Sequence, residues 1–246
     1  MSSFLKIDST NLVSNGLNNS WRYDFVGSSV NFQDVEVAIQ SISLYNSQFN
    51  IDSGAFANTS FKLEVPTGAT VSILNVSLPD GYYSYADINR VIQTTLVNAG
   101  AYLINSTGDN VFYIQLEENS TYYSCQLDVS PTPTSLPVGY TLPATGFILS
   151  NTIPQIHPSS SYIVRCDLVK NNYVVSGDIL AAFDRGDASI GQLITYAPSQ
   201  YAWMNTHNGA RNSITITIYD QNDRPIHFRD LSVSIMLLFR PKKSLL

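Results

Sequence analysis

The sequence predicts an all-β protein, built as an antiparallel sandwich or barrel, on two observations. Apolar and polar residues alternate with a period of two over many short segments, and clusters of Gly, Asn and Pro separate these segments. The clearest alternation covers residues 214–219 and 231–237. Because successive side chains of a strand point to opposite faces, each segment presents one apolar face that a core can bury.

The first long strand is predicted over residues 34–44. Its apolar residues hold odd positions as far as Ile39 and even positions from Ile42 onward. A change of face by one residue indicates a β-bulge near Gln40. The remaining strands are predicted at residues 61–65, 71–76, 101–104, 111–116, 124–129 and 162–168.

One α-helix is predicted over residues 85–98. Ser84 is suited to cap its N-terminus, and Asp87 follows three positions later in a variant of the capping box. Apolar residues then recur at helical spacing, and Gly100 provides a stop. We expect this helix to pack its apolar stripe on a sheet. A shorter helical candidate covers residues 177–183.

Residues 130–161 differ in composition from the rest of the chain. They hold six of the 11 prolines, and a central strand cannot run through them because Pro does not donate a hydrogen bond to a sheet. An interdomain linker is one interpretation. Apolar residues such as Tyr140, Phe147 and Ile156 instead favour a long ordered loop that docks on a surface. We therefore predict a single domain over residues 1–246, with a Pro-rich insertion at 130–161.

Few residues of the chain are charged. Lys, Arg, Asp and Glu make up 13% of the 246 residues, and the net charge is −6. The charged share is about half of what an average soluble domain carries. Hydrophobic residues make up an ordinary 44%, so the composition excludes a disordered chain. Scarce cations argue against non-specific binding of nucleic acid. A weakly charged, Tyr-rich surface suits extensive contact with protein, because little charge must be desolvated.

The sequence contains no recognisable catalytic, cofactor or metal motif. The three histidines match no metal spacing, and Cys125 and Cys166 are expected to be reduced, buried thiols. Residues 220–224 begin like a calcium loop, but Arg224 would repel the ion and Pro225 replaces the required Gly. We predict a hairpin turn there instead. We expect no enzymatic activity, no cofactor and no bound metal.

The N-terminal residues lack the positively charged start and apolar run of a signal peptide. No apolar stretch approaches the ~18 residues that a membrane span requires. We therefore expect a protein that is synthesised inside the cell, is not secreted through a signal peptide and has no membrane span.

Two stretches are candidates for contact with a partner. Residues 239–243 end the last strand with the cations Arg240, Lys242 and Lys243, which form either a solubilising tail or a contact with an acidic surface or packaged nucleic acid. Residues 196–204 gather Tyr, Trp and Met, which either fill the core or anchor a subunit interface.

Three segments, taken together, resemble the penton (minor capsid) proteins of virophages and Polinton-like viruses. The first is the turn and helix start at residues 78–89. The second is residues 161–172 with Asp178-Ile179-Leu180, and the third is residues 216–226 with the closing strand 231–240. These segments cover about half of the chain, and their order and spacing carry the resemblance.

The resemblance implies a single jelly-roll β-sandwich of two four-stranded antiparallel sheets, decorated by the helix and the insertion. It also implies a homopentamer that closes each fivefold vertex of an icosahedral capsid, located in the virion and surrounded by the major capsid protein. A vertex fibre or internal capsid components are further partners to expect, and nucleic acid would be contacted only by the C-terminal tail. The family has no catalytic residues to transfer. The expected intersubunit contacts are Tyr140, Phe147, Ile156, Tyr196, Tyr201 and Trp203.

The sequence is also compatible with other functions. A lectin-like or receptor-binding β-sandwich, such as a viral attachment head, would use Tyr- and Trp-rich loops to stack on sugars. A minor capsid component away from the vertices, or a small relative of the major capsid protein, would share the structural role. An enzyme on a sandwich scaffold comes last, for want of any catalytic constellation.

Overall fold

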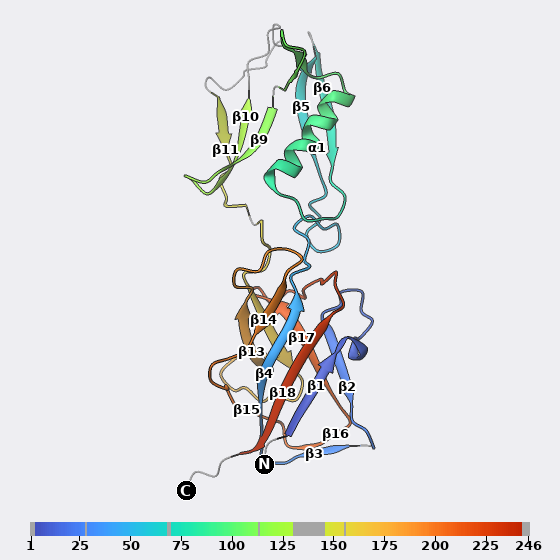
Figure 1. Cartoon of the computed structure of the whole chain (residues 1–246), viewed down its shortest axis with the longest axis vertical. Helices are drawn as coiled ribbons and strands as arrows, with labels where there is room; N and C mark the ends of the chain where they lie inside the picture. Colours follow the sequence, from blue (N-terminus) through green and yellow to red (C-terminus); the bar gives the residue numbers. More distant parts are fainter. Residues whose placement is uncertain are drawn as a thin grey trace. The chain divides into compact units, whose positions relative to one another are not determined.

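The computed structural model describes residues 3–27, 29–67, 70–112, 114–129, 146–154 and 156–242 (Figure 1). The chain divides into two compact units. Unit 1 consists of Met1–Gln48 and Ser159–Leu246, and unit 2 consists of Phe49–Pro158. Unit 2 is therefore inserted into the sequence of unit 1. Within the described ranges, no helix is long and apolar enough to cross a membrane.

Unit 1 contains two antiparallel sheets with four strands along each path. The first sheet has the order β1 (Ser3–Asp8), β18 (Val233–Pro241), β4 (Val35–Tyr45) and β14 (Leu193–Tyr196), and the short β15 (Met204–Asn205) also pairs with β4. The second sheet has the order β13 (Ile179–Asp184), β12 (Ser161–Cys166), β17 (Ser213–Asp220) and β2 (Ser20–Asp24). Unit 1 also contains β3 (Val30–Phe32), β16 (Gly209–Arg211) and the 3-10 helix η1 (Ser9–Asn11).

The strand order of unit 1 follows a regular scheme. When these eight path strands are numbered in chain order, the first sheet reads 1-8-3-6 and the second reads 5-4-7-2. Consecutive strands therefore often lie in opposite sheets. Unit 2 occupies the connection between the third and fourth of these strands, β4 and β12.

One hydrophobic core joins the two sheets of unit 1. Side chains of β17 alternate between half-buried and buried along the whole strand, as the sequence predicts. Ile216 of this strand belongs to the same buried cluster as Ile42 and Ile235 of the first sheet. The aromatic rings of Tyr162 and Phe183 stack within it, with 5.2 Å between their centroids. The period-two pattern thus places one apolar face of each sheet against the other.

The predicted bulge in β4 is confirmed. Met236 of β18 lies opposite Ser41, whereas the next residue, Leu237, lies opposite Ile39. Gln40 is therefore the additional residue in β4, and its side chain is exposed. The bulge lets apolar residues on both sides of it face the core, which explains the change from odd to even positions.

Unit 2 packs its helix against strands. The helix α1 (Tyr85–Asn98) has the predicted bounds, and a reciprocal capping box between Ser84 and Asp87 closes its N-terminus. Gly100 has a φ of 66°, a left-handed conformation that ends the helix at little cost. Ile92 and Leu96 are buried in a second core with residues of β5 and β6. The strands are β5 (Ser60–Thr67), β6 (Thr70–Ser77), β7 (Leu103–Ile104), β8 (Asn110–Val111), β9 (Ile114–Asn119), β10 (Ser124–Val129) and β11 (Phe147–Leu149).

One local prediction is wrong and one is confirmed. Residues 177–183, proposed as a short helix, contribute to strand β13, because Leu180 and Phe183 are buried in the core of unit 1 and tertiary packing overrides local propensity. The turn at residues 220–224 forms, with the Asp220 amide donating to the Arg224 carbonyl at 2.9 Å. Tyr219 and Pro225 are antiparallel bridge partners across it, so the chain reverses at this turn as predicted, although β17 and β18 belong to different sheets.

The predicted insertion at 130–161 is part of a larger one. Residues 130–145 lie outside the described ranges, residues 147–149 form β11 at the edge of a sheet with β10 and β9, and β12 begins at Ser161. The structure shows two compact units. That they form a single domain over residues 1–246 stays a prediction.

Candidate functional site

The first residues of β4 bring together the two stretches that the sequence identifies as candidate contacts. On one side, β15 pairs with β4, so that Asn205 lies opposite Glu36. On the other side, β18 pairs with β4, so that Arg240 also lies opposite Glu36. The aromatic segment before β15 and the cationic end of β18 are therefore neighbours at one end of the first sheet.

An aromatic and ionic cluster forms around Trp203. The Arg240 guanidinium lies 3.9 Å from the centroid of the Trp203 ring, and its Nε donates to Glu36 Oε2 at 2.8 Å. The Tyr201 ring contacts Trp203 edge-on, with 6.0 Å between centroids. The Arg240 and Glu36 side chains are only 25% and 16% exposed, so this pair is better shielded from water than an ordinary surface ion pair. The charge of Arg240 is thus paired with the Glu36 carboxylate of the same chain.

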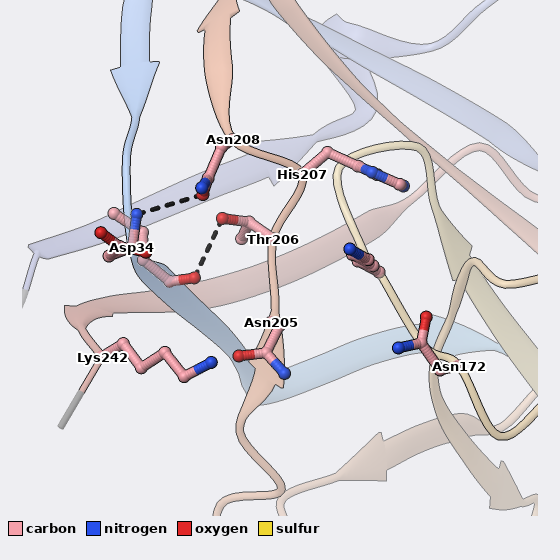
Figure 2. A pocket seen from close by; sticks show the side chains of 9 residues that line it. Asp34, Asn172, Asn205, Thr206, His207, Asn208 and Lys242 are labelled. Atoms are coloured by element: carbon pink, nitrogen blue, oxygen red, sulfur yellow. Dashed lines mark hydrogen bonds between the residues drawn. The ribbon is translucent and has the colours of Figure 1, made fainter. Parts of the chain in front are cut away.

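Beside this cluster lies a polar pocket of about 300 Å³, which we call the β15 pocket (Figure 2). Two lysines line it, Lys170 from the segment after β12 and Lys242 from the residue after β18. One carboxylate, Asp34, lies on the same wall as Lys242 (Figure 2). Its amide side chains come from Asn172, Asn205 and Asn208.

Hydrogen bonds fix the walls of the β15 pocket. Thr206 donates both its amide N–H and its hydroxyl to the Val35 carbonyl, at 3.1 and 2.9 Å (Figure 2 draws the hydroxyl bond). The Lys170 amide donates to the Asn205 carbonyl at 2.8 Å, and the Lys242 amide donates to the Asp34 carbonyl at 2.7 Å. Segments that are far apart in the sequence therefore converge on one hollow in a fixed arrangement.

The charge of the β15 pocket is slightly positive. Lys170 and Lys242 contribute two positive charges and Asp34 one negative charge, while His207 also lines the hollow. The chain has only 13 Lys and Arg residues, so a hollow that holds two of them is a notable concentration. Such a site suits a small anionic group, because ammonium and amide N–H groups are donors.

The other predicted contact residues do not line this pocket. Tyr196 of β14 is half-buried and stacks on Phe183, with 5.0 Å between centroids. Phe147 of β11 is 49% exposed. Ile156 lines a separate hollow of about 450 Å³ in unit 2, beside Tyr85 at the start of α1. Tyr140 and Lys243 lie outside the described residues.

The residues predicted as intersubunit contacts differ in how far the structure exposes them. Tyr196 packs against the core of unit 1, and core packing was one of the two interpretations of residues 196–204. Tyr201 and Phe147 present apolar surface to the outside. As intersubunit contacts, all of these residues stay predictions.

Two titratable side chains in the core of unit 1, Cys166 and Tyr162, have a raised pKa. Burial raises the pKa of the Cys166 thiol to about 12. Burial likewise raises the pKa of Tyr162 to about 12, although a hydrogen bond from Gln48 acts in the opposite direction. A thiol with such a pKa is protonated and unreactive at neutral pH. Within the described residues, no group of three or more His, Cys, Asp or Glu side chains is arranged to hold a metal ion.

Sequence reasoning missed most of the β15 pocket. It identified Lys242, but not Lys170, Asn172, His207 or Asn208. No local motif marks these residues, since they are brought together only by the pairing of β15 and β18 with β4. The scarcity of lysine in the chain is the one signal that could have drawn attention to Lys170.

No family model matches the sequence, and no curated protein matches it. Solved structures from virophages are similar to the chain over nearly its whole length. One is the crystal structure of the mavirus penton protein, with a TM-score of 0.48 and 11% sequence identity, covering 98% of this chain and 99% of that chain. Another is a chain from the 3.5 Å cryo-EM structure of the Sputnik virophage, with a TM-score of 0.46 and 13% identity, covering 98% of each chain.

Proposed function

We propose that this chain is a viral structural protein, a penton subunit that forms pentamers at the fivefold vertices of an icosahedral capsid. The observation that carries the proposal is the strand order of unit 1. Orders 1-8-3-6 and 5-4-7-2 in two facing sheets are those of a jelly roll with two Greek keys, an architecture frequent in viral capsid and lectin domains. Because a fold alone does not determine a function, the surface must supply the rest.

The surface supports a role in assembly. Several large apolar side chains are exposed on the connections of both units, among them Val26, Tyr123, Ile153 and Tyr173. Contact with another protein would bury these apolar side chains, which are now exposed to water. The low content of charged residues reduces the desolvation cost of covering such a surface. A pentamer requires a heterologous interface that closes after five copies, with the major capsid protein around it and a fibre or internal components as further partners.

The lectin-like alternative is disfavoured by the Trp203 cluster. A tryptophan that stacks on a sugar must present an open ring face, and the Arg240 guanidinium, 3.9 Å from the centroid of the Trp203 ring, already occupies one of its two faces. Glu36 holds that guanidinium in place. Binding of the isolated protein to a glycan array, lost on Trp203→Ala, would reverse this choice.

Native mass spectrometry of the purified protein tests the proposal. We expect pentamers, and a population of monomers, dimers or trimers without pentamers would overturn the fivefold role. Tyr201→Asp and Phe147→Asp place a charge on exposed aromatic positions and should reduce the pentamer fraction. Gln200→Asp, exposed next to Tyr201, is the matched control and should leave that fraction unchanged.

A further inference from the structure

We propose that the β15 pocket is a binding site for a carboxylate side chain of a partner protein, with the exposed tip of the adjoining 170–178 loop as its apolar flank. The partner segment is therefore acidic and apolar. This inference goes beyond the capsid role, since it assigns a ligand chemistry to a particular site that stands whether or not the chain forms pentamers.

The two lysines of the pocket carry the first part of the inference. At least five of the eight arginines form ion pairs with carboxylates of the same chain. These pairs are Arg22 with Asp24, Arg90 with Asp87, Arg165 with Asp223, Arg224 with Asp220 and Arg240 with Glu36. Within the ranges that the structure describes, no ion pair involves Lys170 or Lys242. Both side chains are exposed and line the same hollow. An incoming anion would therefore meet two ammonium groups without displacing an existing partner.

Neutral donors add to the two charges. The Asn208 side-chain oxygen accepts the Asp34 amide N–H at 3.1 Å, which assigns the orientation of that amide and leaves its NH₂ group as a donor (Figure 2). Asn172 and Asn205 place further amide groups on the walls. Because backbone hydrogen bonds already fix these walls, little ordering is needed when a ligand binds.

Asp34 limits the kind of anion that fits. Its carboxylate shares the hollow with Lys170 and Lys242, so the three groups sum to a single positive charge. A single carboxylate matches that charge, whereas an extended polyphosphate backbone requires a track of several cations. The net charge of −6 on the whole chain further repels nucleic acid.

The loop beside the pocket supplies the apolar flank. Tyr173 and Val175 are 99% and 111% exposed, although they belong to the loop that provides Lys170 and Asn172. The loop is closed at its base, where the Asn171 amide donates to the Gly177 carbonyl at 2.8 Å. The tip is thus held out into solvent by hydrogen bonds. Aliphatic and aromatic side chains presented in this way are recognised by apolar groups of another protein.

Fluorescence anisotropy with a labelled peptide tests the site. The probe is Ac-Leu-Glu-Leu-Glu-Leu-NH₂, compared with the neutral Ac-Leu-Gln-Leu-Gln-Leu-NH₂ and with a 20-nucleotide single-stranded DNA. We expect the acidic peptide to bind more tightly than the neutral one, and Lys170→Gln or Lys242→Gln to weaken its binding about two- to fivefold, as for a solvent-accessible ion pair. Val175→Ser should weaken both peptides.

Lys62→Gln, an exposed lysine of β5, is the matched control and should leave binding unchanged. Equal binding of the acidic and neutral peptides, absence of binding, or an equal loss in the control would overturn the inference. Tighter binding of the DNA, weakened by the same lysine variants and steeply by salt, would assign the pocket to phosphate instead. Native mass spectra of the same samples distinguish a failure of this inference from a failure of the proposed function. Intact pentamers without peptide binding refute only the carboxylate site, and peptide binding without pentamers refutes only the fivefold role.

Discussion

The substitution Gln48→Met should destabilise unit 1, because it removes the centre of a buried hydrogen-bond network. Gln48 Nε2 donates to the Tyr162 hydroxyl at 2.8 Å, and the Ser159 hydroxyl donates to Gln48 Oε1 at 2.5 Å. All three residues are buried, and Tyr162 is completely inaccessible to solvent. Methionine has a similar length but cannot replace either bond, so both hydroxyl groups lose their partner.

The expected loss in the free energy of unfolding follows from the number of buried hydroxyl groups that lose their hydrogen-bond partner. A buried polar group without a partner costs about 1 to 3 kcal/mol, so two hydroxyls set a range of about 2 to 6 kcal/mol. We expect a loss of about 2 to 3 kcal/mol, at the lower end, because the Met side chain retains apolar packing. That is a large share of the about 5 to 15 kcal/mol by which a typical domain is stable.

Urea unfolding followed by tryptophan fluorescence measures this loss in the right part of the molecule. The chain has two tryptophans, Trp21 and Trp203, and both belong to unit 1. Gln200→Met, at an exposed position of the same unit, is the matched control and should change the free energy of unfolding by less than about 0.5 kcal/mol.

A double-mutant cycle with Tyr162→Phe isolates the hydrogen bond. Once the hydroxyl of Tyr162 is absent, Gln48→Met should cost about 1 kcal/mol less than in the unaltered protein, because one orphaned group fewer remains. A loss equal to that of Gln200→Met, or additive effects of Gln48→Met and Tyr162→Phe, would refute the reasoning.

Three further outcomes follow from burial and charge. The pKa of Tyr162 is raised to about 12 from an ordinary 10, so the stabilising contribution of the protonated tyrosine is complete below pH 10 and is lost as the pH rises toward 12. Urea midpoints should therefore fall between pH 10 and 12, and they should fall less in Tyr162→Phe. Iodoacetamide at pH 8 should modify the half-buried Cys125 before the buried Cys166, as peptide mass spectrometry can show; equal modification in the native protein would contradict the burial. Glu36→Gln leaves a partly buried guanidinium without its carboxylate and should cost about 1 to 2 kcal/mol, whereas Asp24→Asn breaks an exposed pair and should cost less than about 0.5 kcal/mol in the same urea assay.

The elements that the sequence predicted correctly are those whose signals are local. The capping box of Ser84 and Asp87 and the stop at Gly100 lie within a few residues of the helix ends that they determine. The bulge at Gln40 is likewise visible in a single strand as a change of face. In both cases, the physical cause and the sequence signal occupy the same short stretch.

The failures concern relations between distant segments. Residues 177–183 contain Ala181 and Ala182, which favour a helix locally, but the core of unit 1 requires a strand there. Nothing in the residues of β17 and β18 reveals that they join opposite sheets. The β15 pocket depends on segments more than a hundred residues apart, so its composition follows from topology.

The insertion of unit 2 is compatible with the stability of unit 1, because the two residues of unit 1 that flank the insertion are in contact. The chain leaves unit 1 at Gln48 and returns at Ser159, and these two side chains are hydrogen-bonded. The entropic cost of closing a loop grows only with the logarithm of its length, so an insertion of about 110 residues costs about 2 kcal/mol more than a loop of about 10. Unit 2 also has its own buried core around Ile92 and Leu96, separate from the core of unit 1. This connection can therefore carry a large additional surface for contact with other proteins while the sheets of unit 1 keep their pairing.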